Sequence, residues 1–311
     1  MNKVPFLLAP MASLSHRALR TIIEDFGGCD EYFSEMISAG GLLAGGPFEK
    51  FYINTDPRSE KLVFQLVGNE SSIISRAAAI LDKLDCAGID INMGCSAPII
   101  RKSGAGAAWM ADIDRAGELI SCVRTVVKRR LSVKLRIGFK DDFEYLVRFC
   151  RRLMSEGTEL ITLHPRLITE KFKRRARWDY VGALRKELGI PVAGNGDIAT
   201  AEELAAKNEL CPCDAVMVGR AAVRQPWIFA QARSLDCTKK TTPNIEETGL
   251  RFLELLDLHQ PPEFHISRAK LFFGFFCDNL KWGNHLKNLI NREETLTGIE
   301  RVWQGYFKER D

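Results

Sequence analysis

The chain has 311 residues, of which 46% are hydrophobic and 27% charged, a balance typical of a folded globular protein rather than a disordered one. No apolar run approaches the roughly 18 residues that cross a bilayer, and prolines interrupt the short apolar start, so we expect neither a membrane segment nor a signal peptide. The net charge of +4 is too small to indicate a nucleic-acid partner by itself, so the distribution of the charges matters more than their sum.

The cysteines indicate a reducing compartment. There are nine of them, an odd number without regular spacing, which does not fit a framework of disulfides. We therefore expect a cytoplasmic protein with free thiols. Cys211 and Cys213 form a short pair, but no second pair stands at the spacing of zinc ligands, so the sequence predicts no metal site.

Short apolar runs of β type alternate with amphipathic stretches along most of the chain. Several runs are continuously apolar, as strands covered on both faces are. The candidate strands are Pro5–Met11, Glu31–Met36, Leu62–Val67, Gly88–Met93, Ser132–Ile137, Leu160–His164, Pro191–Asn195 and Ala215–Gly219. This repetition predicts an α/β fold of the (β/α)8 TIM-barrel type, and the strand count disfavours the alternative, an open doubly wound sheet.

Helical periodicity is clearest in four of the stretches between these strands. They are Ser71–Leu84, Ile113–Arg130, Phe143–Glu156 and Ala201–Glu209. Asp112, Asp142 and Thr200 precede three of them and are expected to be N-caps, and Glu203 completes a capping box with Thr200.

The alternation stops after Phe229. Ser234–Thr248 is polar and reads as a linker, and from about Glu246 the chain reads as helical. One apolar stripe there contains Phe252, Leu255, Leu256 and His259, and another contains Leu271, Phe272, Phe275 and Phe276. We therefore predict a barrel domain over residues 1–235 and a small helical domain over residues 246–311, in a monomeric protein.

Polar residues stand at the end of nearly every predicted strand. They are Ala9-Pro10-Met11, Gln65, Asn92-Met-Gly-Cys95, Lys134-Leu-Arg136, His164-Pro-Arg166, Gly194-Asn-Gly-Asp197 and Gly219-Arg220. Any one of them reads equally well as an ordinary loop residue. Because the carboxyl ends of barrel strands meet at one rim, where TIM-barrel enzymes carry their chemistry, the whole set predicts an active site.

The last two strand ends have the character of a phosphate site. Glycines allow backbone N–H groups to approach an anion closely, and Arg220 is able to pair with it. Lys134 and Gln65 are suited to the polar edge of a flavin, where a cation stabilises negative charge on the reduced ring.

Cys95 has two readings. A thiol is mostly protonated near neutral pH, so Cys95 is able to donate a proton without a neighbouring base, whereas a nucleophile needs an activating histidine. A buried structural cysteine is the alternative. Gly94 allows a tight turn that exposes the thiol, and Ser103-Gly-Ala-Gly106 downstream is able to move as a lid, which favours the proton donor.

With these residues the chain resembles the dihydrouridine synthases, from Pro5 to about Phe229. The resemblance rests on Ala9-Pro-Met-Ala12, Asp90-Ile-Asn-Met-Gly-Cys95, Arg101-Lys-Ser-Gly-Ala-Gly106, Lys134-Leu-Arg-Ile-Gly138, Thr162-Leu-His-Pro-Arg166, Gly194-Asn-Gly-Asp-Ile198, Met217-Val-Gly-Arg220 and Pro226-Trp-Ile-Phe229. The ordered set is specific, although no single motif is.

The resemblance implies an FMN enzyme that NADPH reduces and that transfers hydride to C6 of uracil in a folded RNA, while Cys95 protonates C5. The target base leaves its stack to reach the flavin. Implied FMN-binding residues are Pro10, Met11, Ala12, Gln65, Lys134, His164, Asn195, Gly196, Asp197, Gly219 and Arg220. Asn92 is implied to place the uracil, and the helical domain to bind the RNA, either tRNA or rRNA.

A basic loop after the sixth predicted strand adds candidate RNA contacts. Residues 171–177 include five positive charges, which beside a base-binding site indicate phosphate contacts rather than a solvated charge run alone. We assign Arg166, Lys173, Arg174 and Arg175 to the substrate on this basis. In the tail, Arg268, Lys270 and Lys281 are expected to form a smaller basic face.

Two other functions stay open. One is a small-molecule flavin oxidoreductase of the dihydroorotate-dehydrogenase type, against which the basic loop and the helical tail speak. The other is an RNA-binding protein with an idle FMN site. The family pattern has proline after its catalytic cysteine and glycine after Ala-Pro-Met-Ala, where this chain has Ser96 and Ser13, and these departures keep the idle protein open as an alternative.

Overall fold

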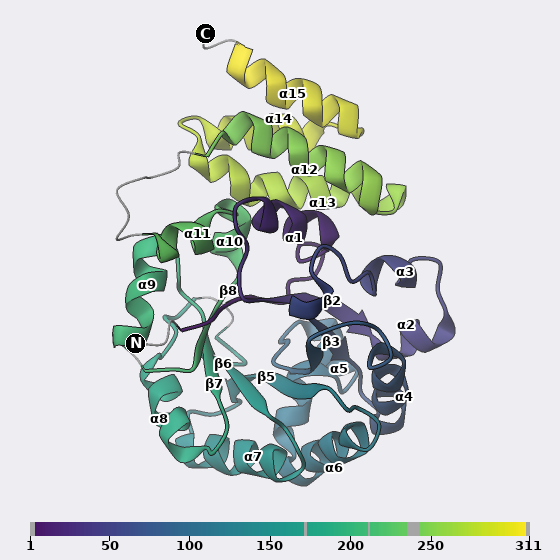
Figure 1. The fold of residues 1–311 in the computed structure, drawn as a ribbon, viewed down its shortest axis with the longest axis vertical. Coiled ribbons are helices and arrows are strands. Elements are labelled where there is room, and N and C mark those ends of the chain that lie inside the picture. The colour runs from purple at the N-terminus through teal and green to yellow at the C-terminus, as the bar shows by residue number, and fades with distance from the viewer. Residues whose placement is uncertain (1–3, 171–172, 211, 235–242, 309–311) are drawn as a thin grey trace.

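The computed structural model describes residues 4–170, 173–210, 212–234 and 243–308, and its strands form a closed parallel barrel in sequential order (Figure 1). The predicted TIM barrel is thereby confirmed. The strands are β1 (Phe6–Leu8), β2 (Glu31–Ser38), β3 (Leu62–Val67), β4 (Gly88–Met93), β5 (Arg130–Gly138), β6 (Leu160–Leu167), β7 (Val192–Asn195) and β8 (Ala215–Val218).

Helices cover the outside of the barrel and form the tail. Around the barrel lie α1 (Arg17–Asp25), α2 (Ala39–Ala44), α3 (Glu49–Tyr52), α4 (Ser71–Leu81), α5 (Pro98–Lys102), α6 (Ile113–Arg124), α7 (Phe143–Ser155), α8 (Asp179–Glu187), α9 (Ala201–Leu210), α10 (Arg220–Arg224) and α11 (Ile228–Arg233). The tail contains α12 (Ile245–His259), α13 (Pro262–Phe276), α14 (Gly283–Arg292) and α15 (Leu296–Lys308). Within the described residues, no helix is both long enough and apolar enough to cross a membrane.

The ends of the elements depart from the predicted bounds for local reasons. β1 ends at Leu8 rather than Met11, because Pro10 has no N–H for the ladder and the N–H of Met11 bonds to Ser15 Oγ at 2.9 Å. α6 ends at Arg124 rather than Arg130, because the Asp82 carboxylate accepts the N–H groups of Lys128 and Arg129.

The predicted helix caps are largely confirmed. Asp112 accepts the N–H groups of residues 114 and 115, and Asp142 accepts that of residue 145. At α9 the side chain of Thr200 accepts the Glu203 N–H at 3.2 Å, but Glu203 accepts from Ala199 rather than from Thr200, so the capping box closes one residue early.

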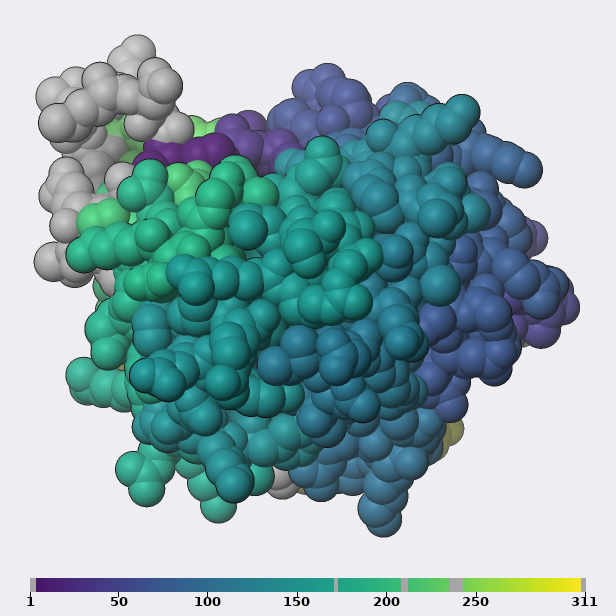
Figure 2. Space-filling view, turned by 90° about the horizontal axis from the view of Figure 1, so that it is seen from below, coloured from purple at the N-terminus to yellow at the C-terminus, as the bar shows by residue number. Residues whose placement is uncertain are grey.

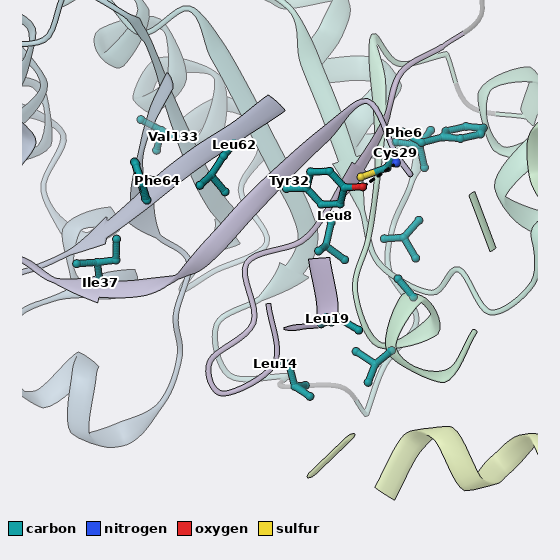
Figure 3. Packing of buried hydrophobic residues seen from close by; sticks show 14 of the residues in the cluster. Phe6, Leu8, Leu14, Leu19, Cys29, Tyr32, Ile37, Leu62, Phe64 and Val133 are labelled. Carbon is teal, nitrogen blue, oxygen red and sulfur yellow. Dashed lines mark hydrogen bonds between the residues drawn. The ribbon is translucent and has the colours of Figure 1, made fainter. Parts of the chain in front are cut away.

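The sequence alternation of each strand separates two faces of the barrel. Leu7 belongs to a small interior cluster with Phe33 and Val63, whereas Phe6 and Leu8 face the surrounding helices. Figure 3 shows part of this outer layer, in which side chains of β1, β2 and β3 belong to one buried cluster with Leu14 and Leu19. On the side of the barrel away from the tail, α6, α7 and α8 form one continuous outer surface (Figure 2).

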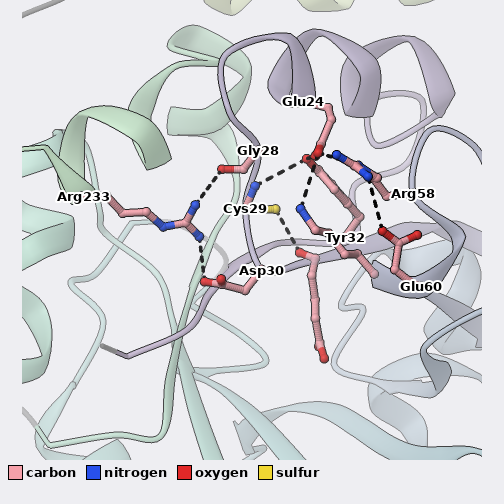
Figure 4. A network of polar contacts seen from close by, with 10 residues as sticks. Glu24, Gly28, Cys29, Asp30, Tyr32, Arg58, Glu60 and Arg233 are labelled. Carbon is pink, nitrogen blue, oxygen red and sulfur yellow. Dashed lines mark hydrogen bonds and ion pairs between the residues drawn. The ribbon is translucent and has the colours of Figure 1, made fainter. Parts of the chain in front are cut away.

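A network of polar side chains lies around the start of β2 (Figure 4). It joins the end of α1, the residues that precede β2 and β3, and the end of α11. Glu24 accepts from the Tyr32 hydroxyl and, at 2.7 Å, from Arg58 Nε. Arg233, the last residue of α11, bonds to Asp30 at 2.8 Å. These contacts lie where strands begin, so they fasten the closure of the barrel and leave the opposite rim for chemistry.

The tail lies beside α1, α10 and α11 and has an aromatic interior (Figure 1). Phe252 stacks on Phe272 with ring centroids 3.6 Å apart, and Trp303 packs on Phe273 at 4.7 Å.

The first predicted apolar stripe of the tail is confirmed at Phe252, Leu255 and Leu256, while the second is wrong at Leu271, which is 37% exposed. α13 instead buries Phe272, Phe273 and Phe276. The division at residues 235 and 246 stays a prediction.

A buried ion pair fastens this tail to the barrel. Arg268 is 2% exposed, and its guanidinium lies 3.2 Å from the carboxylate of Glu35 on β2 and also bonds to Gln260. Arg268 was expected on an exposed basic face with Lys270 and Lys281, and that expectation is wrong. Glu35 also accepts the Ser13 N–H at 2.6 Å, so the pair reaches the loop that follows β1.

Replacing Arg268 with Leu should lower the free energy of unfolding by about 3–5 kcal/mol, because it leaves the Glu35 carboxylate buried without its cation. Burial raises the pKa of Glu35, and Arg268 and the Ser13 N–H partly oppose that rise. Loss of Arg268 raises it further, so the defect should shrink as the pH falls and the carboxyl takes up a proton. Urea unfolding at pH 5 and pH 8 measures this.

Lys281→Ala, at an exposed position of the tail, is the matched control and should change stability by less than about 0.5 kcal/mol. Equal stability of Arg268→Leu and the wild type at pH 8 would contradict a tether of this strength.

Candidate active site

The carboxyl ends of the strands surround a cavity of about 1230 Å³. Most of the predicted site residues line it, namely Pro10, Met11, Asn92, Cys95, Lys134, His164, Arg166, Arg175, Asn195, Gly196, Asp197, Gly219 and Arg220. This volume exceeds the roughly 300–1,000 Å³ typical of a pocket for one small ligand. The cavity is therefore large enough for a cofactor together with part of a substrate.

Four predicted residues lie away from the lining of the cavity. Gln65 is fully buried one layer below it, and Ala12 is exposed in the loop after β1. Lys173 and Arg174 are exposed on the loop after β6, as expected for contacts with a large partner. Lys171 lies outside the described residues.

Cys95 stands on a turn that its neighbours hold from several sides. The side-chain oxygen of Asn92 accepts the N–H groups of Gly94 at 3.2 Å and Cys95 at 2.9 Å. Arg136 Nε donates to the Gly94 carbonyl at 3.1 Å. A Cβ at Gly94 would lie 3.3 Å from the backbone of Leu135, so the glycine allows close approach to β5.

The stretch predicted as a lid forms the back of this turn. Gly106 has φ +58°, and a Cβ there would lie 2.8 Å from the Cys95 carbonyl. That carbonyl also accepts the Ala107 N–H at 3.0 Å. Ala105 and Ala107 are buried, so this stretch supports the cysteine as part of the packed structure.

The polar interior continues below the turn. Asn92 Nδ2 donates to Gln65 Oε1 at 2.8 Å, and Gln65 Nε2 donates to Asp90 at 2.7 Å. The other oxygen of Asp90 accepts from Ser132 Oγ at 2.6 Å. Lys134 pairs in register with Asn92, and both residues line the cavity.

Burial and the neighbouring Arg136 lower the pKa of Lys134 from 10.5 to about 8, and Asp90 partly opposes the shift. An ammonium with this pKa is charged at neutral pH but only partly solvated. Its charge is therefore able to stabilise a negatively charged group in the cavity.

His164 and Asp197 are joined by one arginine. Arg166 Nη1 lies 2.9 Å from His164 Nε2, and because an arginine only donates, His164 accepts there and carries its proton on Nδ1. Burial lowers the pKa of His164, and the surrounding cations lower it further, so the ring is neutral. Arg166 Nη2 donates to Asp197 at 2.5 Å, and Nε donates to the Arg174 carbonyl.

Each nitrogen of the Arg166 guanidinium therefore donates a hydrogen bond to a protein group, and the residue is only 2% exposed. Its assignment to the substrate stays a prediction. Burial alone would raise the pKa of Asp197, but the hydrogen bonds from Arg166 and the Ala176 N–H outweigh it and hold that pKa below its ordinary value. Asp197 has φ +52°, so an uncommon backbone conformation accompanies these bonds.

Cations gather where β7 and β8 end. Asn195 Nδ2 donates to the Met217 carbonyl at 2.8 Å, and Gly196 with φ +125° passes close to the His164 ring. Arg220 is joined by two cations that the sequence analysis did not single out, Arg224 and Lys207. Arg224 lies one helical turn after Arg220, and that spacing was a signal available in the sequence.

Other lining residues could not be found from the sequence pattern. Trp178 donates to the Gly196 carbonyl at 2.9 Å, and Lys207 Nζ lies 4.3 Å from its ring centre. Phe275 and Asp278 come from the tail and line the same cavity. The apolar stripe predicted for the tail marked Phe275 only as a packing residue, and nothing in the sequence around Asp278 indicated that it lines the cavity.

The positively charged residues of the basic loop differ in whether they are paired within the fold or exposed to solvent. Arg177 pairs with Glu170 at 2.5 Å and lies 3.8 Å from Asp141. The side chain of Arg174 is 76% exposed, and its Nε lies 3.9 Å from Glu170. Lys173, Arg174 and Arg175 therefore present charge to solvent, and Arg177 serves the fold. No cluster of metal-ligating side chains occurs in the described parts of the chain.

Comparisons with known proteins agree with one family. A sequence model described as "Dihydrouridine synthase (Dus)" matches residues 7–295. A probable tRNA-dihydrouridine synthase of Aquifex aeolicus is 33% identical over 236 residues, which cover 74% of this chain and 73% of the relative. The tRNA-dihydrouridine(16) synthase of Cupriavidus necator is 27% identical over 310 residues, with 96% of each chain covered.

A further relative and a solved structure extend the likeness. The tRNA-dihydrouridine synthase B of Pseudomonas aeruginosa is 26% identical and covers 98% of this chain and 93% of the relative. A 2-naphthoyl-CoA reductase in complex with 2-naphthoyl-CoA superimposes with a TM-score of 0.56 at 9% identity, over 74% of this chain and 50% of that one. At this identity the structure shows a shared fold alone.

Lys134→Met should stabilise the cofactor-free protein at neutral pH, by on the order of 2–3 kcal/mol. Below pH 8 the folded and unfolded states both carry the ammonium, so its desolvation costs stability in full. Above pH 10.5 both states are neutral and the difference vanishes. Unfolding by urea between pH 7 and pH 10.5 should therefore show the difference shrinking from pH 8 upward.

Lys186→Met on the exposed side of α8 is the control, and its small effect should not depend on pH. A pH-independent difference for Lys134→Met as well would mean that the Lys134 ammonium is not desolvated.

Proposed function

Since the chain belongs to the dihydrouridine synthase family, whose members are flavin-dependent oxidoreductases that reduce uridine in tRNA, we propose that it forms 5,6-dihydrouridine with FMN as cofactor and NADPH as reductant. The observation that carries the proposal is the Cys95 turn, which holds a thiol at the rim of a cavity lined by cations. A proton donor belongs at such a rim, where a base enters.

The residues present fit FMN. Arg220, Arg224 and Lys207 supply positive charge where a ribityl phosphate would lie, and Gly196 and Gly219 leave backbone close to it. Asn195 would contact the same end. Because the Asp197 carboxylate is engaged by Arg166 and Ala176, we assign its backbone N–H, rather than its charge, to the phosphate.

The ring of the cofactor fits the other half of the cavity. Pro10 and Met11 line one edge and would contact the ring there, Ala12 would contact it only from the loop after β1, and neutral His164 faces the ring without adding charge. Lys134 would lie at the polar edge, where its ammonium stabilises negative charge. Gln65 would act through Asn92, to which it is hydrogen-bonded.

When bound, FMN supplies the hydride that C6 of uracil receives. Cys95 then donates its proton to C5, so that the two hydrogens saturate the C5–C6 double bond, and water returns a proton to the thiolate. Asn92 uses one N–H for Gln65 and has a second for the uracil edge.

The RNA would lie across the basic loop and the tail. Lys173, Arg174 and Arg175 are exposed on the rim, and Phe275 and Asp278 bring the tail to the same cavity. A folded tRNA is the substrate that the relatives' names support, with rRNA as the other RNA to test. We propose that a monomer acts on it in the cytoplasm.

Cys95→Ala should keep its FMN and its rate of flavin reduction by NADPH, because the thiol is assigned to the base rather than to the cofactor. Reoxidation of the reduced flavin by tRNA should slow by about 10²–10⁴-fold, the usual worth of a positioned general acid. Stopped-flow single-turnover assays with undermodified tRNA measure both steps. Cys122→Ala, at an exposed position on α6, should behave as the wild type.

Dihydrouridine formation at the wild-type rate by Cys95→Ala would refute the assignment. The same assay separates the alternatives. Oxidation by a free pyrimidine rather than by tRNA would favour the dihydroorotate-dehydrogenase type. Flavin that NADPH reduces and that no RNA reoxidises would favour the idle RNA-binding protein.

The double variant Arg174→Ala/Arg175→Ala should bind tRNA more weakly and with a smaller dependence on salt. Each lost phosphate contact reduces the slope of log K against log salt by about 0.7–0.9 through counterion release. Filter binding over a range of salt concentrations measures the slope.

The control has the same change in net charge on the opposite end of the barrel. Lys83→Ala/Lys128→Ala removes two exposed lysines from the segments between α4 and β4 and between α6 and β5. Its slope should match the wild type, and an equal loss in both variants would mean that only total charge matters.

A further inference from the structure

Asp90 lies in the barrel interior and is untouched by solvent, with an exposed fraction of 0%. It contacts neither the cavity nor any residue assigned above to the phosphate end. An isolated carboxylate at such a place is costly, so its partners indicate its purpose. Those partners are Gln65 and Ser132, at 2.7 and 2.6 Å.

The hydrogen bonds from Asp90 to the catalytic turn form one directed chain. Gln65 Nε2 donates to Asp90, Asn92 Nδ2 donates to Gln65 Oε1, and the Cys95 N–H donates to Asn92 Oδ1, at 2.7, 2.8 and 2.9 Å. Gln65 and Asn92 are also nearly enclosed, at 0% and 7% exposure. Water therefore does not compete for these bonds.

The donor-to-acceptor direction of this series of hydrogen bonds is set by Asp90, the last acceptor in it. An ionised carboxylate only accepts, whereas the side-chain amides of Gln65 and Asn92 have one accepting and one donating end and are able to flip. With its NH₂ turned toward Asp90, Gln65 presents oxygen to Asn92. Asn92 must then present its NH₂ downward and its oxygen upward, where the Cys95 and Gly94 N–H groups require an acceptor.

We propose that Asp90 is a positioning residue which, by fixing the orientation of the Gln65 and Asn92 amides, holds Cys95 in place to deliver its proton. The proposal rests on the function proposed above for Cys95. It assigns a purpose to a buried charge that the reaction itself does not use.

The ionisation of Asp90 is compatible with this role. Burial raises its pKa to about 6, with hydrogen bonds from Ser132 and Gln65 opposing the rise, so the acceptor-only form dominates at neutral pH. Asp90 also raises the pKa of Lys134, so it acts as a counter-charge to that ammonium as well. The experiment must therefore distinguish the loss of this charge from the loss of the hydrogen bond to Gln65.

Two substitutions of Asp90 separate polarity from charge. Asp90→Asn removes the charge but keeps an oxygen that accepts from Gln65, while its NH₂ faces Ser132, whose hydroxyl has the Ile89 carbonyl 3.5 Å away as another acceptor. Asp90→Ala removes both the charge and the acceptor. The difference between the two variants therefore reports on the hydrogen-bonded chain alone.

The first readout does not require turnover. In FMN-saturated protein, the rate of alkylation of Cys95 by iodoacetamide is measured by peptide mass spectrometry against that of the exposed Cys122 in the same sample. In Asp90→Ala the Cys95 to Cys122 ratio should rise about tenfold, because the turn opens locally once its acceptor is no longer held. In Asp90→Asn it should stay within about twofold of the wild type.

The second readout is the reaction. Asp90→Ala should slow tRNA-driven reoxidation of the flavin by about 10-fold to 10²-fold, with the concentration of tRNA for half-maximal rate unchanged, and Asp90→Asn should recover most of it. Thr162→Val is the matched control, since Thr162 is buried in β6, two strands away from Asp90, and its hydroxyl has no hydrogen-bond partner in the described structure. It should match the wild type in both readouts.

Gln65→Met breaks the chain one link higher and should repeat the alkylation result of Asp90→Ala, which keeps the test open where Asp90→Ala does not fold. An unchanged ratio in a folded Asp90→Ala or in Gln65→Met would overturn the proposal, and so would an Asp90→Asn ratio equal to that of Asp90→Ala. Failure of the proposed function appears separately, as full activity of Cys95→Ala.

Discussion

A closed barrel shields the polar groups of its interior from water, and this constraint orders the upper half of the barrel. The lower interior is apolar, with Leu7, Phe33 and Val63, so polar groups above it must find partners among themselves. Asp90 does so through Gln65 and Ser132, and desolvation moves the pKa values of Asp90 and Lys134 toward each other, to about 6 and about 8. The need to pair these buried groups also fixes the orientation of the Asn92 amide, whose oxygen accepts the N–H groups of the Cys95 turn.

The tail takes part in the site and does more than extend the barrel. Arg268 is buried against Glu35, and Glu35 holds the N–H of Ser13, two residues after the Met11 that lines the cavity. Ser13 has φ +61°, a conformation that favours glycine, which explains why glycine stands there in the family pattern. The short bond to Glu35 offsets the strain, so the serine departure is structurally accommodated and does not by itself indicate an idle site.

Burial divides the arginines in and near the loop after β6 into two groups, one paired within the fold and one exposed to solvent. Arg166 and Arg177 come from the same basic region as Arg174, yet the first two are taken up by carboxylates and a histidine within the fold. Arg174 and Arg175 stay exposed at the rim. A count of positive residues in the sequence treats these side chains alike, whereas the acidic partners Asp197 and Glu170 decide which of them are available to an RNA.

The sequence by itself determined the barrel, most strand bounds and the residues at the strand ends, because alternation and burial are local properties that period and composition record. It also predicted that Cys95, Lys134 and Arg220 lie together, and all three line one cavity. Only the tertiary structure decided that Arg268 is buried, that Phe275 and Asp278 reach the cavity, and that Gln65 faces Asp90 rather than the cavity. These outcomes depend on which partner lies opposite each side chain, and that pairing between distant segments leaves no periodic signal in the chain.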